Sequence, residues 1–190
     1  MTDIMLDLET LGVDSNSVVI SISAVEFNRK TGKIGREFEI GLDATEQEIR
    51  GGIINQSTLD WWAEQSVEAR KELARLERHP VDVALKAYAV WIDKSKATTV
   101  WGNGATFDNV ILENLFKRHN VAYPTKFWDN RCVRTLCDLL RINPKKTKFV
   151  GVPHRGLDDC KHQITYCMKG FKPNTDDCAE EEKVIECPSR

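Results

Sequence analysis

The sequence predicts one α/β domain in which a mixed β-sheet, an antiparallel meander plus parallel strands, carries helices on both faces. Three strand-like segments joined by short turns open the chain, and such a run forms an antiparallel meander. Later strand-like segments alternate with segments of helical periodicity, which is typical of parallel additions to a sheet. A length of 190 residues with 41% hydrophobic side chains suffices for one complete core.

The first expected strand, residues 4–10, carries two carboxylates. Side chains alternate along a strand, so three aliphatic side chains share one face while Asp7 and Glu9 lie together on the other. Two carboxylates about 6.5 Å apart in a partly dry setting repel each other unless a cation lies between them. This pattern indicates a divalent metal ion, and the alternative is an edge strand whose polar face lies in water.

The remaining strands are expected in an order that puts the first strand at the centre of the sheet. Residues 18–27 are rich in β-branched side chains, and turn residues at 28–32 lead into a third strand at 36–42. Residues 98–103 are expected to pair with the first strand, and residues 127–129 to form one more short strand.

Helical spacing of apolar residues and capping signals predict the helices. They are expected as one turn at 46–50 and as helices at 57–64, 66–75, 81–92, 106–115, 132–141 and after His154. The apolar stripe of the helix at 132–141 would contain Val133, Leu136, Leu139 and Leu140. We expect residues 1–170 to form the single domain and residues 171–190, which are acidic and lack periodicity, to form a loosely ordered tail.

Composition limits the partners and the compartment. The net charge of −2 does not indicate nucleic acid, so a polyanion would have to meet a local basic patch or bound metal. A solvated connection is the favoured interpretation of the basic loop with Lys145, Lys146 and Lys148, although these lysines, with Arg155, could guide a phosphate backbone. Neither a signal peptide nor an apolar run of membrane-spanning length is present, so we expect a cytoplasmic protein with no membrane partner.

The six cysteines contain no C-x-x-C pair and are expected to be thiols in a reducing compartment. Cys160, His162 and Cys167 could be considered as zinc ligands. However, Cys160 and Cys167 are seven residues apart on the apolar stripe of an expected helix, so we favour small buried hydrophobic residues.

Three motifs carry the chemistry, namely residues 7–12 (DLETLG), 105–108 (ATFD) and 154–159 (HRGLDD). With these three motifs in this order, the chain resembles the DnaQ-like (DEDDh) 3′–5′ exonucleases, which have an RNase H-like fold. The resemblance covers nearly the whole folded part of the chain. Trp61-Trp62 and residues 127–134 look most like the bacterial and phage branch near RNase T and the phage exonucleases.

The resemblance implies a two-metal site. Asp7, Glu9 and Asp159 would hold one Mg²⁺ or Mn²⁺ ion, and Asp7 with Asp108 would hold a second. Hard cations prefer such oxygen ligands, and two of them stabilise the attacking and leaving oxygens of a phosphodiester. His154 would act as the general base on the attacking water.

Helical periodicity alone leaves the choice between Asp158 and Asp159 open, because both flank the apolar stripe of the last helix at similar angles. The family spacing, five residues after the histidine, selects Asp159. Two departures from the family pattern occur. Asn103-Gly104-Ala105 stands where the family commonly has His-Asn-Ala, and Gly156 stands where it commonly has Ala. Neither position is a metal ligand in the family, so these departures would affect contact with substrate.

The implied substrate is the 3′ end of a single strand, whose last nucleotide enters a cleft too narrow for a duplex. Contacts with it are expected from Thr10, Leu11, Trp61, Asn103 and Phe107. Thr10 and Leu11 would touch the terminal sugar and base by resemblance, whereas Phe107 either lines the pocket or packs in the core. One of Trp61 and Trp62 either stacks on a base or packs, and at most one of these adjacent side chains can be deeply buried.

The sequence therefore predicts a metal-dependent 3′–5′ exonuclease that acts on single-stranded DNA in preference to RNA and releases nucleoside 5′-monophosphates. The alternatives are a 3′–5′ exoribonuclease and a nucleic-acid-binding module of the same fold that has lost catalysis. Oligomeric state is left open, and a homodimer is compatible with the sequence.

Overall fold

The protein is described by a computed structural model that covers residues 2–104 and 106–171. Its strands are β1 (Asp3–Thr10), β2 (Val19–Phe27), β3 (Ile34–Leu42), β4 (Arg78–His79), β5 (Thr99–Gly102) and β6 (Asn130–Cys132). They form one sheet in the order β4-β3-β2-β1-β5-β6. The β1–β2 and β2–β3 pairs are antiparallel, whereas β1–β5, β5–β6 and β3–β4 are parallel. The predicted mixed sheet is confirmed, and the edge-strand alternative for β1 is wrong because β1 is central.

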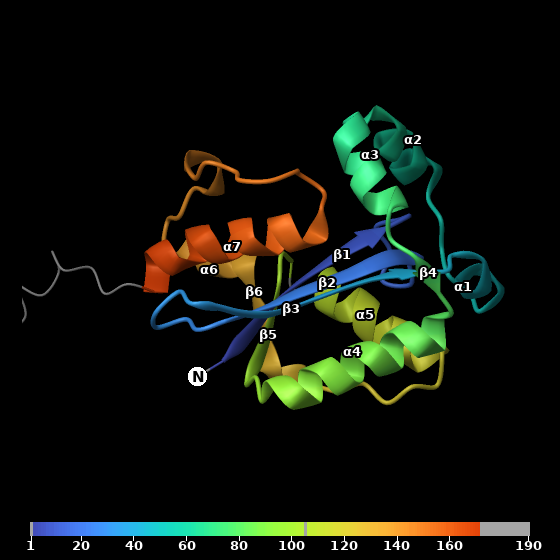
Figure 1. The fold of residues 1–190 in the computed structure, drawn as a ribbon, viewed down its shortest axis with the longest axis horizontal. Coiled ribbons are helices and arrows are strands. Elements are labelled where there is room, and N and C mark those ends of the chain that lie inside the picture. Colours follow the sequence, from blue (N-terminus) through green and yellow to red (C-terminus); the bar gives the residue numbers. More distant parts are fainter. Residues whose placement is uncertain (1, 105, 172–190) are drawn as a thin grey trace, which may run out of the picture.

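Helices cover both faces of the sheet, as predicted (Figure 1). They are α1 (Thr45–Ile49), α2 (Gln56–Glu64), α3 (Val67–Ala74), α4 (Val81–Ser95), α5 (Asp108–Arg118), α6 (Val133–Leu139) and α7 (Gly156–Phe171), with 3₁₀ helices η1 (Phe127–Asp129) and η2 (Pro144–Lys146). The alternation along β1 explains the two layers. Leu6 and its same-face neighbours pack against α4 and α5, whereas Met5 packs on the other face against α6 and α7.

A third, smaller cluster fixes α2 over the carboxyl end of β1, where Figure 1 shows α2 and α3 beyond the arrowhead of that strand. The buried residues Val18, Ile20 and Trp62 form its centre. The indole Nε1 of Trp62 donates a hydrogen bond to the carbonyl oxygen of Thr10 over 3.0 Å. This contact brings the paired tryptophans of α2 next to the strand that carries Asp7 and Glu9.

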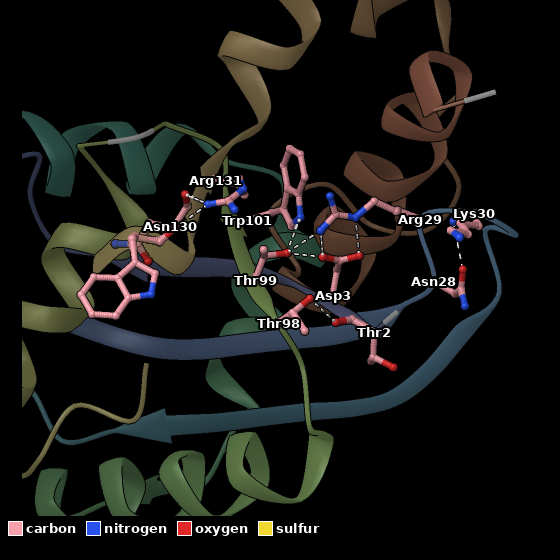
Figure 2. A network of polar contacts seen from close by, with 11 residues as sticks. Thr2, Asp3, Asn28, Arg29, Lys30, Thr98, Thr99, Trp101, Asn130 and Arg131 are labelled. Atoms are coloured by element: carbon pink, nitrogen blue, oxygen red, sulfur yellow. Dashed lines mark hydrogen bonds and ion pairs between the residues drawn. The ribbon is translucent and has the colours of Figure 1, made fainter. Parts of the chain in front are cut away.

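At the opposite end of β1 a buried ion pair joins three elements (Figure 2). Asp3 is fully buried and pairs with Arg29, which follows β2 and donates from Nε to Asp3 Oδ2 over 2.8 Å. The Thr99 hydroxyl of β5 also donates to Asp3, and Trp101 Nε1 donates to Thr99 Oγ1 over 3.2 Å. The network holds Asp3 opposite Thr99, the first pair in the β1–β5 register.

Some expected elements differ from the structure. Residues 127–129 form the 3₁₀ helix η1 and not a strand, because the Asp129 carboxylate accepts the N–H of Lys126 over 3.4 Å while Phe127 and Trp128 stay exposed. The strand follows directly as β6. The two-residue strand β4 was not predicted.

Two helix predictions also need correction. Leu139 and Leu140 were predicted to be buried, but they are 74% and 46% exposed, because α6 ends at Leu139 and its inner face is formed by Val133 and Cys137. Helix α5 begins at Asp108 and not at residue 106, since Phe107 has non-helical dihedral angles.

Cys160 and Cys167 are buried in the core beneath α7, in agreement with the interpretation as small hydrophobic residues. The Cys160 thiol donates to the Met5 carbonyl oxygen over 3.5 Å. The expected tail lies outside the described residues except for Phe171, which ends α7. Within the described part of the chain, no helix has both the length and the apolar character needed to cross a membrane.

Candidate active site

Four carboxylates from three elements line one cleft of about 660 Å³. Asp7 and Glu9 come from β1, Asp108 is the first residue of α5, and Asp159 lies in the first turn of α7. The sheet order explains their meeting, because β1 lies beside β5 and α5 begins just beyond the carboxyl end of β5. All four predicted metal ligands are thus brought to one place.

Asp7 is held by α7. The Gln163 side-chain amide donates from Nε2 to Asp7 Oδ1 over 2.9 Å. Burial raises the pKa of Asp7 well above its ordinary value, and the nearby charges of Asp108 and Asp159 raise it further, while the bond from Gln163 opposes this. Burial and the same acidic neighbours also raise the pKa of Glu9.

Asp108 is fixed by two backbone amides. The Leu8 N–H donates to Oδ1 over 3.2 Å and the Asn103 N–H donates to Oδ2 over 2.8 Å. Burial raises the pKa of Asp108 to about 6, although these two bonds act in the opposite direction. The Asp108 carboxylate therefore links the backbone of β1 to the backbone of the β5–α5 loop.

Asp159 and its neighbour Asp158 point to different places. Asp159 lines the cleft, and burial raises its pKa to about 6. Asp158 is outside the lining, and its Oδ2 accepts the Val152 N–H over 2.9 Å. The geometry thus separates two residues that periodicity could not, and it places the residue with the family spacing in the cleft.

His154 lies beside the acidic cluster. Potential ligand atoms of Glu9, His154 and Asp159 all lie within 4.8 Å of one another. The His154 backbone is left-handed, with φ of 65°, and its ring meets the Trp61 ring edge-on at a centroid distance of 4.9 Å. Burial lowers the pKa of His154, so the imidazole is neutral at pH 7 and can accept a proton.

The two tryptophans have different environments. Trp62 is 8% exposed and belongs to the third cluster, whereas Trp61 is 40% exposed. Both line the cleft, and their rings are 5.0 Å apart in an edge-on arrangement. Only Trp62 is buried, as expected for adjacent residues on a helix.

The donor set fits divalent metal ions. Four carboxylates supply oxygen ligands of the kind that Mg²⁺ and Mn²⁺ prefer. Without a cation, burial and the neighbouring carboxylates raise the pKa values of Asp7 and Glu9. A bound cation removes this repulsion, so the site is built for positive charge.

The expected substrate contacts are placed in part. Thr10, Trp61, Asn103 and Phe107 line the cleft, and Phe107 also packs against the core beneath α4 and α5. Leu11 does not line it, because the chain turns after Thr10 and Leu11 packs against the third cluster. Gly12 and Val13 take that place in the lining.

The basic residues near the last helix also lie outside the cleft. Lys145, Lys146 and Lys148 are exposed, and Arg155 forms an ion pair with Glu72 of α3, with Nε 3.2 Å from Oε2. The possible role of these residues in guiding phosphate therefore finds no support in this geometry.

Among the lining residues that sequence reasoning missed, Gln163 and Arg134 are the ones with side chains suited to bind a carboxylate or a phosphate. Gln163 could have been found, because it lies four residues after Asp159 and hence on the same face of α7. Arg134 belongs to none of the three motifs, but it is the last residue of the stretch 127–134 that resembles the bacterial and phage branch, and this resemblance is the signal that could have drawn attention to it.

Gly156 departs from the family pattern for a reason that lies behind the cleft and not in substrate contact. A Cβ atom at this position would lie 2.4 Å from Ser23 Oγ and 3.4 Å from Asp7 Oδ2. Ser23 is the residue of β2 paired with Asp7. Glycine therefore lets α7 approach the sheet closely where Ser23 occupies the space.

Comparison with known proteins agrees with this site. A family model described as the 3′–5′ exoribonuclease Rv2179c-like domain matches residues 2–171. A curated relative, an exodeoxyribonuclease of Enterobacteria phage T4, is 26% identical over 223 residues, which cover 94% of this chain and 96% of the relative.

Two solved structures show the same fold. The nuclease domain of 3′hExo, a DEDDh family member bound to rAMP, superposes with a TM-score of 0.58 at 13% identity over 88% of this chain and 90% of that chain. Escherichia coli Exonuclease I in complex with a dT13 oligonucleotide gives a TM-score of 0.60 at 13% identity over 88% of this chain and 40% of that chain. Since the family model spans residues 2–171 and the fold is that of the DEDDh enzymes, this protein belongs to the 3′–5′ exoribonuclease Rv2179c-like family and is a DnaQ-like 3′–5′ exonuclease.

Proposed function

We propose that this enzyme shortens single-stranded DNA from its 3′ end and releases nucleoside 5′-monophosphates, using two divalent metal ions. The observation that carries the proposal is the convergence of four carboxylates and His154 on one cleft. Similarity over nearly the full length to an exodeoxyribonuclease supports DNA as the substrate. The same site in a binding module without catalysis would have no need for buried, mutually repelling carboxylates.

Asp7, Glu9 and Asp159 would hold one Mg²⁺ or Mn²⁺ ion, and Asp7 with Asp108 would hold the other. When bound, such ions neutralise charge on the attacked phosphate and on the leaving oxygen. Gln163 orients Asp7, and the backbone amides of Leu8 and Asn103 orient Asp108, so both carboxylates are fixed before a cation binds.

His154 takes a proton from the attacking water. Its neutral imidazole has a free lone pair at pH 7 because burial lowers its pKa. The left-handed backbone and the edge of Trp61 hold the ring next to Glu9 and Asp159. The water from which His154 takes a proton would therefore lie on the α2 side of the carboxylates.

The terminal nucleotide lies against Thr10, Asn103 and Phe107, with its base on the exposed face of Trp61. Stacking on an aromatic ring contributes about 1–3 kcal/mol per base and does not select sequence. A single strand of any sequence would then be accepted.

We also propose that the enzyme acts in the cytoplasm. The thiols of Cys137 and Cys167 are free and lie buried in the same core cluster. A reducing compartment keeps such a pair reduced.

Digestion of 5′-labelled dT20 and rU20 tests the proposal, with Mg²⁺ and then with EDTA and with a DNA duplex for comparison. The expected result is stepwise shortening of dT20 that stops in EDTA, release of dTMP, and slower digestion of rU20 and of the duplex. Shortening in EDTA, or release of 3′-monophosphates, would contradict the mechanism.

The second candidate is an exoribonuclease, favoured by the description of the family model. Faster digestion of rU20 than of dT20 in the same experiment would replace DNA by RNA as the substrate. The metal and base assignments would be unchanged.

A further inference from the structure

The cleft is acidic, yet its substrate is a polyanion. Among the described residues that line it, Arg134 is the one lysine or arginine. Metal ions can neutralise the carboxylates at the centre, but the strand leaving the cleft still carries a negative charge at each phosphate. A permanent cation on the lining is therefore the feature of this surface that requires explanation.

Arg134 lies on the Asp108 side of the cleft. It is in the first turn of α6, and its Nε is 4.0 Å from the point that a Cβ atom of residue 104 would occupy. This loop also supplies the Asn103 N–H that binds Asp108. His154 lies elsewhere, against Trp61 and with Glu9 and Asp159.

The guanidinium of Arg134 is available to a ligand. Its side chain is exposed, and it makes no hydrogen bond or ion pair to any other residue that the structure describes. In contrast, Arg29, Arg36 and Arg75 are each paired with a carboxylate. An arginine keeps its charge at every working pH and can donate two parallel hydrogen bonds to a phosphate.

The direction of attack identifies the phosphate. Displacement at phosphorus is in line, so the leaving oxygen lies opposite the water that His154 deprotonates. The remaining strand then leaves on the side of Asp108 and Arg134. Arg134 is exposed, whereas Glu9 and Asp108 are buried and Asp7 and Asp159 are half-buried. Such an exposed cation on the lining suits the next phosphate along the strand and not the one under attack.

We propose that Arg134 binds the phosphodiester immediately 5′ of the scissile one. This inference rests on the proposed function. It adds a binding residue that favours strands with at least two phosphodiester linkages next to the 3′ end, namely the scissile linkage and the one before it. The charge-assisted bonds would hold the strand in register during attack, so their effect is on binding and on the first cleavage step.

The test uses dT8 in which one phosphodiester is replaced by an uncharged methylphosphonate. The replacement is made at the second linkage from the 3′ end or, as a control, at the fifth. Single-turnover release of the first nucleotide is measured with Mg²⁺ for the wild type and for Arg134→Gln. Arg131→Gln is the matched control, because Arg131 is an exposed arginine three residues away that donates to the Trp128 and Asn130 carbonyl oxygens and lies outside the cleft lining.

The expected result is a loss of about tenfold or more for the wild type at the second linkage and none at the fifth. Arg134→Gln should lose a similar factor on unmodified dT8 and nothing further on the modified strand. Arg131→Gln should behave as the wild type. An Arg134→Gln enzyme that is as fast as the wild type on dT8, or that still loses tenfold from the second methylphosphonate, would overturn the inference.

A binding measurement separates this inference from the proposed function. Anisotropy of 5′-fluorescein dT8 is followed against salt in a His154→Ala background, with Mg²⁺ present. Adding Arg134→Gln should reduce the salt slope by about 0.7, the value for one phosphate contact on a single strand, and adding Arg131→Gln should leave it unchanged. If no protein cleaves dT8 but this slope change is found, the proposed function fails while binding of a strand phosphate by Arg134 is retained; an unchanged slope refutes the inference.

Discussion

The residue with the clearest chemical assignment is His154, whose ring is held between Trp61 and the acidic cluster. His154→Ala is expected to lower the single-turnover rate by about 10² to 10⁴, because the proposed general base is removed while the carboxylates remain. Isothermal titration of Mn²⁺ should give nearly unchanged affinity. Loss of metal binding in this variant would instead identify the histidine as a ligand, which its proximity to Glu9 and Asp159 would permit.

Gly156 and Ser23 are expected to act as a pair. Gly156→Ala would place a Cβ atom 2.4 Å from Ser23 Oγ and 2.6 Å from Ser23 Cβ, so α7 must shift and carry Asp159 with it. We expect about 1–3 kcal/mol of destabilisation and a clear loss of rate.

The double-mutant cycle with Ser23→Gly checks this coupling, because that change removes both contacting atoms. Thermal or urea unfolding and single-turnover rates are measured for the four proteins. The second substitution should recover part of both losses, and strictly additive effects would show that the two positions are independent.

For single residues, the sequence predicted those at family motif positions and missed Gln163, although helical spacing from Asp159 reaches it. Asp7, Glu9, Asp108, Asp159 and His154 stand at family positions, and the structure brings them to one cleft. Leu11 was misplaced because its packing against the third cluster depends on α2, about fifty residues later in the chain. Arg134 is fixed by tertiary neighbours alone.

Among the elements, β1 to β3 could be predicted because their alternation and turn residues are local signals. Strand β4 could not, since its two residues have no periodicity and pair with β3 only after the chain has passed through α2 and α3. Phe127 and Trp128 suggested a strand from β-propensity, but propensity describes a half-buried surface and both side chains are exposed.

The junction of β1, β5 and the β2–β3 turn depends on one buried ion pair. Arg29→Met would leave the Asp3 carboxylate buried without its partner, and we expect a destabilisation of about 3 kcal/mol. Replacing both residues together, as Asp3→Leu with Arg29→Met, should recover most of it. Urea unfolding measures both, and a loss under about 1 kcal/mol for the single variant would mean that Arg29 is not needed.

For the whole molecule, the acidic cleft sets a pH dependence of the metal-free protein. Asp108 and Asp159 have folded pKa values of about 6, above the ordinary value of 3.8, so between these values the folded state binds more protons than the unfolded state. The stability that they contribute is complete below pH 3.8 and is lost as pH rises through 6, by up to about 3 kcal/mol for each group.

Unfolding in urea with EDTA, from pH 4 to 7.5, tests this sign. The difference between the wild type and Asp159→Asn isolates one group, and it should move in favour of the variant as pH rises. Adding Mn²⁺ at pH 7.5 should reverse the difference, since a cation that binds only the folded state stabilises it. A wild type that gains relative to the variant between pH 4 and 6 would contradict the expectation.

The buried carboxylates at the two ends of β1 differ in the source of their counter-charge. Asp3 has its counter-charge in the chain, from Arg29, whereas the counter-charge that we propose for Asp7 and Glu9 comes from metal ions in solution. The first arrangement can therefore be replaced by substitutions within the chain that change Asp3 together with its partners Arg29 and Thr99. The second end has no such route, since no exchange within the chain substitutes for a supplied ion. Within the eight residues of β1, Asp3 can thus change together with its partners in the chain, whereas the proposed role of Asp7 ties it to the supply of metal ions.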